Sequence, residues 1–395
     1  MNQEVTSAGT VPSQSAALKF VVLLGVVSLF ADITYEGARS LSGPYLNLLG
    51  ASATVVGVTA GFGEFIGYAL RLVSGWLTDR TRRYWALTII GYAVNLLAVP
   101  LLALAGSWEI AVGLLIAERL GKAIRTPARD VMLSHAAGRL GRGWGFGLHE
   151  ALDQIGGVSG PLLMAAALYA RTDYPTAFGL LLIPALLALA VLVAARFRYS
   201  QPEQFEPRTP KLETRGFPRA FWIYLAAVAL VAAGFADFPL IAFHLKQQQV
   251  APDNWIPLLY AAAMAVDAVA ALIFGRLFDK VGLPILAAVA LLSSLFAPLV
   301  FLGSLAWVFL GMALWGVGMG AQESIMKAAV AEMVPSDRRG SAYGLFNFGY
   351  GSVWFLGSAL MGFLYDRSLY ALVAFSVVMQ LASIPLFLLV RTGKK

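Results

Sequence analysis

The sequence predicts an all-α membrane protein with twelve transmembrane helices, arranged as two six-helix bundles related by a pseudo-two-fold repeat. First, 59% of its 395 residues are hydrophobic and only 13% are charged, whereas soluble domains carry about 25% charged residues. Second, twelve apolar segments long enough to cross a membrane follow one another along the chain. Third, motifs of the first half return in the second half. This composition excludes a soluble enzyme.

The apolar segments are separated by short polar connections. A bilayer core of about 30 Å requires roughly 20 apolar residues per helix, so the chain has room for twelve spans and short loops. Connections of a few residues make neighbouring helices antiparallel. The segments begin near Ala17, Val55, Trp85, Ile110, Trp144 and Thr176, and then near Arg219, Trp255, Leu283, Trp307, Ala342 and Tyr370.

One connection, between the sixth and seventh segments, is much longer and more polar than the others. It contains three prolines and charges of both signs, which is typical of an extended linker. We therefore predict a cytoplasmic N-terminal tail (1–16), an N-terminal six-helix bundle (17–198), a cytoplasmic linker (199–217), a C-terminal six-helix bundle (218–391) and a cytoplasmic tail (392–395).

The basic residues predict the orientation of the chain. If the N-terminus is cytoplasmic, eighteen Lys and Arg lie on the cytoplasmic side and only Arg171, Lys246 and Arg367 lie on the other. This positive-inside bias places both termini in the cytoplasm and the protein in the inner membrane. It also explains the net charge of +7 without nucleic-acid binding. The polar first sixteen residues lack a basic n-region, so we expect no removable signal peptide.

The two halves resemble each other in sequence. Phe30-Ala31-Asp32 returns as Phe235-Ala236-Asp237. Parallel repeats of six spans place a solute site between two rocking bundles, so the repeat predicts transport by alternating access. Further matches are Gly75, Leu77, Asp79 and Arg80 with Gly275, Leu277, Asp279 and Lys280, and Arg142-Gly143, Gly147 and Gly160 with Arg339-Gly340, Gly344 and Gly357.

Several classes of chemistry are disfavoured. The chain has no cysteine and only three histidines, which are far apart, so we expect no disulfide and no metal site. It contains neither a G-x-x-x-x-G-K-[ST] nucleotide loop nor a plausible catalytic triad. We therefore expect no cofactor and no enzymatic activity. A membrane sensor or scaffold that transports nothing is a distant alternative.

The loop after the second span carries a family resemblance. The segment Gly75-Trp76-Leu77-Thr78-Asp79-Arg80-Thr81-Arg82-Arg83 resembles the signature G-x-L-a-D-r-x-G-r-r of the major facilitator superfamily, with Arg82 in place of the Gly. A weaker copy spans residues 275–282. The Asp at a helix end can oppose the positive N-terminus of a helix in the other bundle. The expected conformational latch comprises Gly75, Asp79, Arg80, Arg83, Gly275 and Asp279.

Two further segments resemble the twelve-span drug/proton antiporters of this superfamily. In the fifth span, Gly147, Gly156 and Gly160-Pro161 match the pattern g-x8-G-x3-G-P-x2-G, although Met164 replaces the last Gly. Small residues there permit close helix packing and gating, while packing alone is the alternative. Residues 119–123 resemble the R-x-x-q-G pattern of the fourth span, with departures at Lys122 and Ala123.

Ionisable residues within the spans are the candidates for function, because each costs about 2.5 to 3.5 kcal/mol to insert. A carboxyl group in a partly dry cavity can load and release a proton as its exposure changes. The structural alternative is that these acids only pair with bases. The candidate proton-coupling residues are Asp32, Glu36, Glu150, Asp153 and Asp237.

Basic and aromatic stripes predict the substrate site. Lys122, Arg125 and Arg129 lie on one face of the predicted fourth helix. They either bind an anion or compensate the charge of the nearby acids. Asn347, Tyr350 and Trp354 share a face that suits an amphipathic solute, although aromatic stripes also serve packing. The predicted substrate-binding residues are Arg39, Lys122, Arg125, Arg129, Asp267, Glu323, Asn347, Tyr350 and Trp354.

Together these features predict a monomeric, proton-coupled secondary transporter. The leading interpretation is export of a small amphipathic or charged solute in exchange for protons. The alternative is a proton symporter that takes up an organic anion. Its partners would be the solute, protons and the lipid bilayer.

Overall fold

The computed structural model describes residues 14–140, 142–199, 216–334 and 339–390. Most of both predicted tails and of the linker, with several of the predicted cytoplasmic bases, therefore lie outside the described residues. The first half contains α1 (Gln14–Leu48), α2 (Ala53–Thr81), α3 (Tyr84–Leu101), the 3₁₀ helix η1 (Leu102–Leu104), α4 (Trp108–Leu140), α5 (Arg142–Tyr169), α6 (Tyr174–Leu180) and α7 (Leu182–Arg198).

The second half contains α8 (Arg219–Gly234), α9 (Phe238–Gln247), α10 (Trp255–Val281), α11 (Pro284–Ser293), α12 (Phe296–Leu302), α13 (Leu305–Met333), α14 (Arg339–Arg367) and α15 (Leu369–Leu389). The described residues form no β-strand, so the all-α prediction is confirmed. The pairs α3/η1, α6/α7, α8/α9 and α11/α12 each form one pass, and twelve passes result. Ten of these are long and apolar enough to cross a membrane. The other two are α4, which carries many charges, and α14, which is rich in glycine.

Three of these four pairs, α6/α7, α8/α9 and α11/α12, are broken for a common reason in sequence. Each second piece contains a proline close to its start: Pro184 in α7, Pro239 in α9 and Pro298 in α12. Proline lacks an N–H and clashes with the carbonyl of the preceding turn, so a helix tends to break just ahead of it. These breaks are details that the apolar segments alone did not predict.

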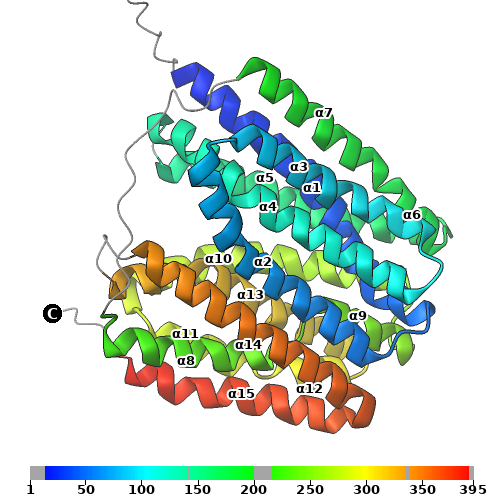
Figure 1. Cartoon of the computed structure of the whole chain (residues 1–395). Coiled ribbons are helices and arrows are strands. Elements are labelled where there is room, and N and C mark those ends of the chain that lie inside the picture. The colour runs from blue at the N-terminus through cyan, green and yellow to red at the C-terminus, as the bar shows by residue number, and fades with distance from the viewer. Residues whose placement is uncertain (1–13, 141, 200–215, 335–338, 391–395) are drawn as a thin grey trace, which may run out of the picture.

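The helices from the two halves diverge on the left of Figure 1 and converge on the right. On the right, Gly43 packs against the backbone of Pro239 and Phe243, and Gly57 packs against Ser358. These contacts join α1 to α9 and α2 to α14, which come from opposite halves. We call this the closed end. The opposite end, where α1 begins, is the open end.

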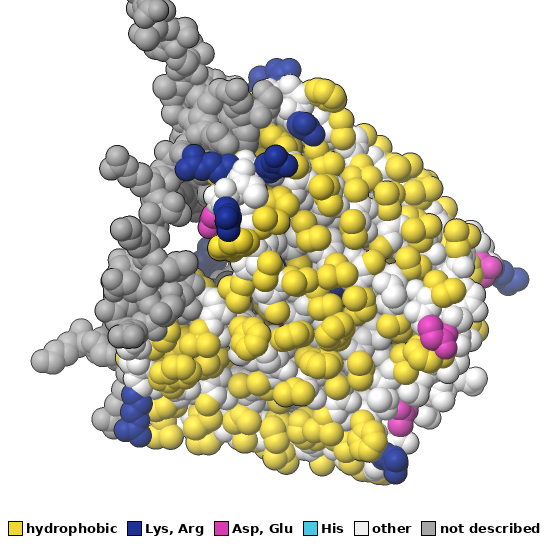
Figure 2. Space-filling view, viewed as in Figure 1, with side chains coloured by type: hydrophobic (Ala, Val, Ile, Leu, Met, Phe, Trp, Pro, Cys, Tyr) yellow, Lys and Arg dark blue, Asp and Glu magenta, His cyan; other side chains and the backbone are white. Residues whose placement is uncertain are grey.

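The outer surface is apolar over most of its height. Figure 2 shows hydrophobic side chains covering this face, with charged side chains gathered near the two ends. Large exposed hydrophobic residues include Leu72, Val73 and Trp76 on α2. Such a belt matches the hydrocarbon core of a bilayer.

Candidate functional site

A central cavity of about 770 Å³ lies between the two halves of the chain. Its lining comes from the middle of α1, the C-terminal parts of α2, α10 and α13, and the N-terminal parts of α5 and α14, together with two residues of α4. These parts lie toward the open end. A volume of this size accommodates a drug-sized molecule.

A network of charges lies at the end of this cavity nearest the closed end. Glu64 of α2 binds Arg39 of α1 at 3.3 Å and Arg119 of α4 at 3.1 Å. Arg119 also binds Glu118 at 3.1 Å, and Arg39 reaches Asp237 of the second half at 3.4 Å. We call these five residues the Glu64 network. It joins four helices and links the two halves of the chain.

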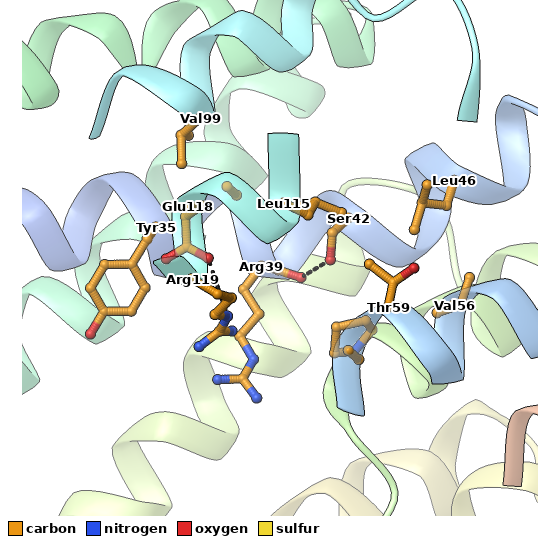
Figure 3. Close-up of a pocket in the computed structure, with 13 residues that line it drawn as sticks. Tyr35, Arg39, Ser42, Leu46, Val56, Thr59, Val99, Leu115, Glu118 and Arg119 are labelled. Atoms are coloured by element: carbon orange, nitrogen blue, oxygen red, sulfur yellow. Dashed lines mark hydrogen bonds and ion pairs between the residues drawn. The ribbon is translucent and has the colours of Figure 1, made fainter. Parts of the chain in front are cut away.

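The Glu64 network separates the central cavity from a second, smaller one. This smaller cavity, of about 40 Å³, lies on the closed-end side of the network and is lined by Ser42, Leu46, Val56 and Thr59 among others. Figure 3 shows the Arg39 and Arg119 side chains next to each other below it, with Glu118 against Arg119. A solute crossing the protein along this axis has to pass the network.

Asp237 lies at a break in a membrane helix. The break between α8 and α9 frees the carbonyl of Ala236, and the Trp315 indole N–H donates a hydrogen bond to it at 2.9 Å. Freed backbone groups inside a membrane require such a partner. The Asp237 carboxylate itself accepts hydrogen bonds from Trp354 Nε1 at 2.9 Å and Ser358 Oγ at 2.7 Å. Asp237 therefore joins α9, α14 and, through Arg39, α1.

Asp32 has a very different environment from Asp237, although the two hold equivalent places in the repeat. Asp32 lies in the uninterrupted helix α1, lines the cavity and is 6% exposed. Among the described residues it has no hydrogen bond or ion pair at contact distance. The charged groups that act on it electrostatically are Asp153, Lys122, Arg125 and Glu36.

The other predicted proton-coupling residues also line the cavity but have partners. Tyr260 of α10 donates a hydrogen bond to Glu36 of α1 at 2.5 Å, which is a second link between the halves. Asp153 lies 3.7 Å from His149, and His149 is also 3.3 Å from Ser28. Glu150 lines the cavity near the open end.

The cationic stripe of α4 divides between two environments. Lys122 lines the cavity, and its ammonium group lies 3.8 Å from the centre of the Tyr35 ring. Arg125 is 1% exposed and stacks on Tyr92 at 4.1 Å, outside the described cavity lining. Arg129 binds Asp130 at 2.8 Å and Ser28 at 3.2 Å, also away from the lining. Of the three, only Lys122 is placed to meet a solute in this conformation.

The second half contributes the predicted aromatic wall. Tyr350 and Trp354 line the cavity with their ring centroids 5.3 Å apart, and Asn347 and Glu323 line it as well. Asp267 is placed differently, because it is fully buried outside the described lining. Neither of its carboxylate oxygens has a hydrogen-bond partner among the described residues.

The glycines of the fifth span have two different surroundings. A Cβ atom on Gly160 would lie 2.8 Å from the Gly37 nitrogen of α1, and one on Gly156 would lie 2.8 Å from the Asp32 Cβ. Glycine at these positions therefore permits the close packing of α1 and α5, next to Pro161. Gly147 has open space around it and lines the cavity instead.

The signature loop lies at the open end. Asp79 and Asp279 are exposed, and among the described residues neither has an ion pair or side-chain hydrogen bond. Arg80 stacks on Trp76 at 5.2 Å. Arg82, the departure from the signature, ends α2 with a left-handed φ of 51°, and Gly282 ends α10 with φ 76°. The structure thus shows why the signature prefers glycine at this position.

One contact at the closed end was missed by the sequence reasoning. Asp366, at the end of α14, accepts hydrogen bonds from the backbone nitrogens of Ala53 at 3.1 Å and Thr54 at 2.8 Å, and from Thr54 Oγ1 at 2.6 Å. It therefore caps the N-terminus of α2 from the other half of the chain. A sequence signal existed: Gly362-Phe363-Leu364-Tyr365-Asp366-Arg367 repeats the pattern G-x-L-x-D-R of residues 75–80.

Comparison with known sequences identifies a family. A profile of the Major Facilitator Superfamily matches residues 23–358 and again residues 240–394. An uncharacterized protein of Mycobacterium tuberculosis is 43% identical over 385 residues, covering 95% of this chain and 94% of the relative. An uncharacterized MFS-type transporter of Methanocaldococcus jannaschii is 25% identical over 364 residues, covering 89% of each chain.

Solved structures share the fold. A nucleoside transporter superposes with a TM-score of 0.76 at 12% identity, covering 93% of this chain and all of that one. A POT family transporter in complex with 5-aminolevulinic acid superposes with a TM-score of 0.76 at 13% identity, covering 94% of this chain and 95% of that one. These likenesses confirm the predicted fold.

Proposed function

The chain belongs to the Major Facilitator Superfamily and is a multi-pass membrane transporter, and we propose that it exports a small amphipathic or charged solute in exchange for protons. We place it in the inner membrane as a monomer with both termini in the cytoplasm, on the basis of its positive-inside charge bias. In this orientation the central cavity opens to the cytoplasm.

The position of Asp32 is the main support for proton coupling. Its carboxyl group lines the cavity at the interface of α1 and α5, without a donor among the described residues. Burial disfavours the charged form of a carboxyl group, whereas a nearby cation favours it. Movement of Lys122 relative to Asp32 would therefore change the proton affinity of Asp32. Glu64, in contrast, pairs with the guanidinium groups of Arg39 and Arg119, which favours a structural role.

Alternating access requires contacts that can exchange between the two ends. We propose that the bundles 17–198 and 218–391 move as rigid bodies joined by the linker 199–217. In the present conformation Asp366 caps α2 at the closed end, while Asp79 and Asp279 of the proposed latch make no ion pair with another described residue. Closure of that latch would accompany opening of the opposite end. The close packing at Gly156 and Gly160 supports a likeness to the drug/proton antiporters.

The Asp32→Asn variant tests the proton site. A thermal-shift screen of the purified protein against anions, metabolites and drugs at two pH values first identifies a solute. In proteoliposomes with a pH-sensitive dye, adding that solute to the wild type should move protons, and Asp32→Asn should reduce this movement at least about tenfold, since an amide does not titrate. Glu109→Gln, which removes an exposed carboxylate at the start of α4, is the control.

The result also separates the alternatives. Protons and solute moving in opposite directions indicate an antiporter, while movement in the same direction indicates the symporter. Proton movement in Asp32→Asn equal to that of the wild type would exclude Asp32 as the coupling site.

A further inference from the structure

The basic residues of the central cavity fall into two groups. Arg39 and Arg119 share the carboxylate of Glu64, and each also binds a second carboxylate, that of Asp237 and of Glu118 respectively. Arg39 Nε has no hydrogen-bond partner among the described residues. Lys122 and Arg71 also line the cavity, yet neither has a carboxylate within ion-pair distance among the residues that the structure describes. The Lys122 ammonium lies over the face of Tyr35, and the Arg71 guanidinium lies 5.6 Å from the centre of the Tyr68 ring.

Both side chains are half-buried at the cavity wall, where a negative partner that enters the cavity can pair with them. The Nε atom of Arg71 is buried and has no hydrogen-bond acceptor in the described part of the chain. Both cations interact electrostatically with Glu64, so one negative group can be near both. Because that carboxylate is already held by Arg39 and Arg119, an anion from outside the protein is the partner that could pair with both Lys122 and Arg71.

The cavity carboxylates do not supply this anion. Asp153 lies beside His149, and Glu36 accepts the hydrogen bond from Tyr260. Glu150 and Glu323 have partners of their own. Asp32 has no hydrogen bond or ion pair among the described residues. It acts electrostatically on Lys122 together with Glu36 and Glu118, and protonation of Asp32 would remove one of these three competing carboxylates. Anion binding and proton binding would then support each other.

The wall next to Arg71 is aromatic. Tyr68, against which Arg71 stacks, meets the ring of Tyr350 edge-on at 5.5 Å, and Tyr350 continues the wall to Trp354. This wall joins α2 to α14. It offers ring faces and edges to an apolar group that lies next to the cations, which is a typical way of binding an amphipathic molecule.

We propose that the central cavity binds an organic anion with an aromatic body, whose carboxylate pairs with Lys122 and Arg71 and whose ring packs on Tyr68, Tyr350 and Trp354. This inference rests on the proposed function, because it names the solute class of the same cavity. Arginine and lysine are both suited to a carboxylate, arginine through its planar fork and lysine as a compact charge.

Binding to the purified full-length protein in lipid nanodiscs tests the proposal without any gradient. The probes are phenylacetate, phenethyl alcohol and phenethylamine, which share a ring and differ in charge, and cyclohexylacetate, which keeps the charge and loses the aromatic ring. We expect thermal stabilisation by phenylacetate, weaker stabilisation by cyclohexylacetate and none by the alcohol or the amine.

Variants assign the effect to the two cations. Lys122→Gln and Arg71→Gln should each weaken phenylacetate binding at least about tenfold, which is the usual loss for a hydrogen bond to a charged group. Arg276→Gln removes an exposed arginine outside the cavity lining and should bind as the wild type does. Lys122→Arg should retain most of the affinity.

Three outcomes overturn the proposal: stabilisation by the amine equal to that by phenylacetate, no stabilisation by phenylacetate at millimolar concentration, or unchanged binding in both glutamine variants. The proposed function fails separately. Phenylacetate that binds through both cations and crosses proteoliposomes without proton movement would leave the anion site intact and exclude proton coupling. Proton-coupled transport of an organic cation, without binding of phenylacetate, would leave the proposed function intact and exclude the anion site.

Discussion

The Asp366 cap predicts how strongly the closed end is held. Asp366→Ala removes three hydrogen bonds between the halves, two to backbone nitrogens of α2 and one to the Thr54 hydroxyl. The variant keeps the other cap of α2, in which the Ser52 hydroxyl accepts a hydrogen bond from the Val55 nitrogen at 3.3 Å. Both residues of this cap belong to the first half. Loss of an aspartate cap costs about 0.5 to 2 kcal/mol. Since three hydrogen bonds are lost, we expect the closed end to be destabilised by about 1 to 2 kcal/mol. This corresponds to a factor of about 5 to 30 in the equilibrium between its closed and open conformations.

Spin-label distances measure this equilibrium directly. The chain contains no cysteine, so Leu104→Cys and Tyr370→Cys introduce labels at the closed end without further changes. Both side chains are well exposed, at 78% and 74%. In nanodiscs, Asp366→Ala should increase the population with the longer distance by the factor given above, because opening no longer breaks the cap.

The control is an aspartate cap of the same kind that does not join the two halves. Asp173 accepts a hydrogen bond from the Thr176 nitrogen of α6 at 2.9 Å, and both residues belong to the first half. Asp173→Ala should leave the distance distribution unchanged. If Asp366→Ala gives the same distribution as Asp173→Ala, the cap does not hold the closed end and the reasoning is wrong.

Three further predictions concern stability, measured as unfolding of the purified protein. Arg82→Gly should raise the free energy of unfolding by about 1 kcal/mol by relieving the left-handed conformation, whereas Arg82→Ala should not. Gly160→Ala should lower it by about 1 to 3 kcal/mol by separating α1 from α5, while Gly147→Ala, in open space, should have no effect. Glu64→Gln should lower it by about 3 kcal/mol, because two guanidinium groups lose their shared carboxylate, and exposed Glu109→Gln should not. Equal behaviour of a variant and its control would contradict the corresponding reason.

Most of the fold could be predicted from the sequence because the bilayer restricts the possible structures so strongly. Each predicted segment begins within three residues of the helix that opens the corresponding pass, as with Ala17 and Gln14 for the first. The breaks were not predicted, because hydropathy averages over a window and does not respond to one residue. Pro239 was visible in the sequence, but only the packing of Trp315 against the Ala236 carbonyl makes that break stable.

The candidate site was less predictable than the fold. Helical spacing placed Lys122, Arg125 and Arg129 on one face, but spacing does not reveal which neighbouring helix covers each turn. The structure covers Arg125 with Tyr92 of α3 and leaves Lys122 at the cavity. Contacts between the halves, such as Glu36 with Tyr260, join residues 224 positions apart, and no local pattern encodes such a pair.

The recurrence of G-x-L-x-D-R has a physical consequence for the α2–α14 pair. Both helices end on this motif, α2 at Asp79 and α14 at Asp366, and because the helices are antiparallel the two aspartates lie at opposite ends of the molecule. Each carboxylate can stabilise only the N-terminus of a helix that approaches it, where the unpaired N–H groups and the helix dipole are located. Rocking of two rigid bundles brings the helices together at one end as it separates them at the other. The cap at Asp366 and the exposed carboxylate at Asp79 are therefore expected to alternate, so that one is capping a helix when the other is free. A substitution at either aspartate should change the relative populations of the two conformations, and with them the contacts at both ends.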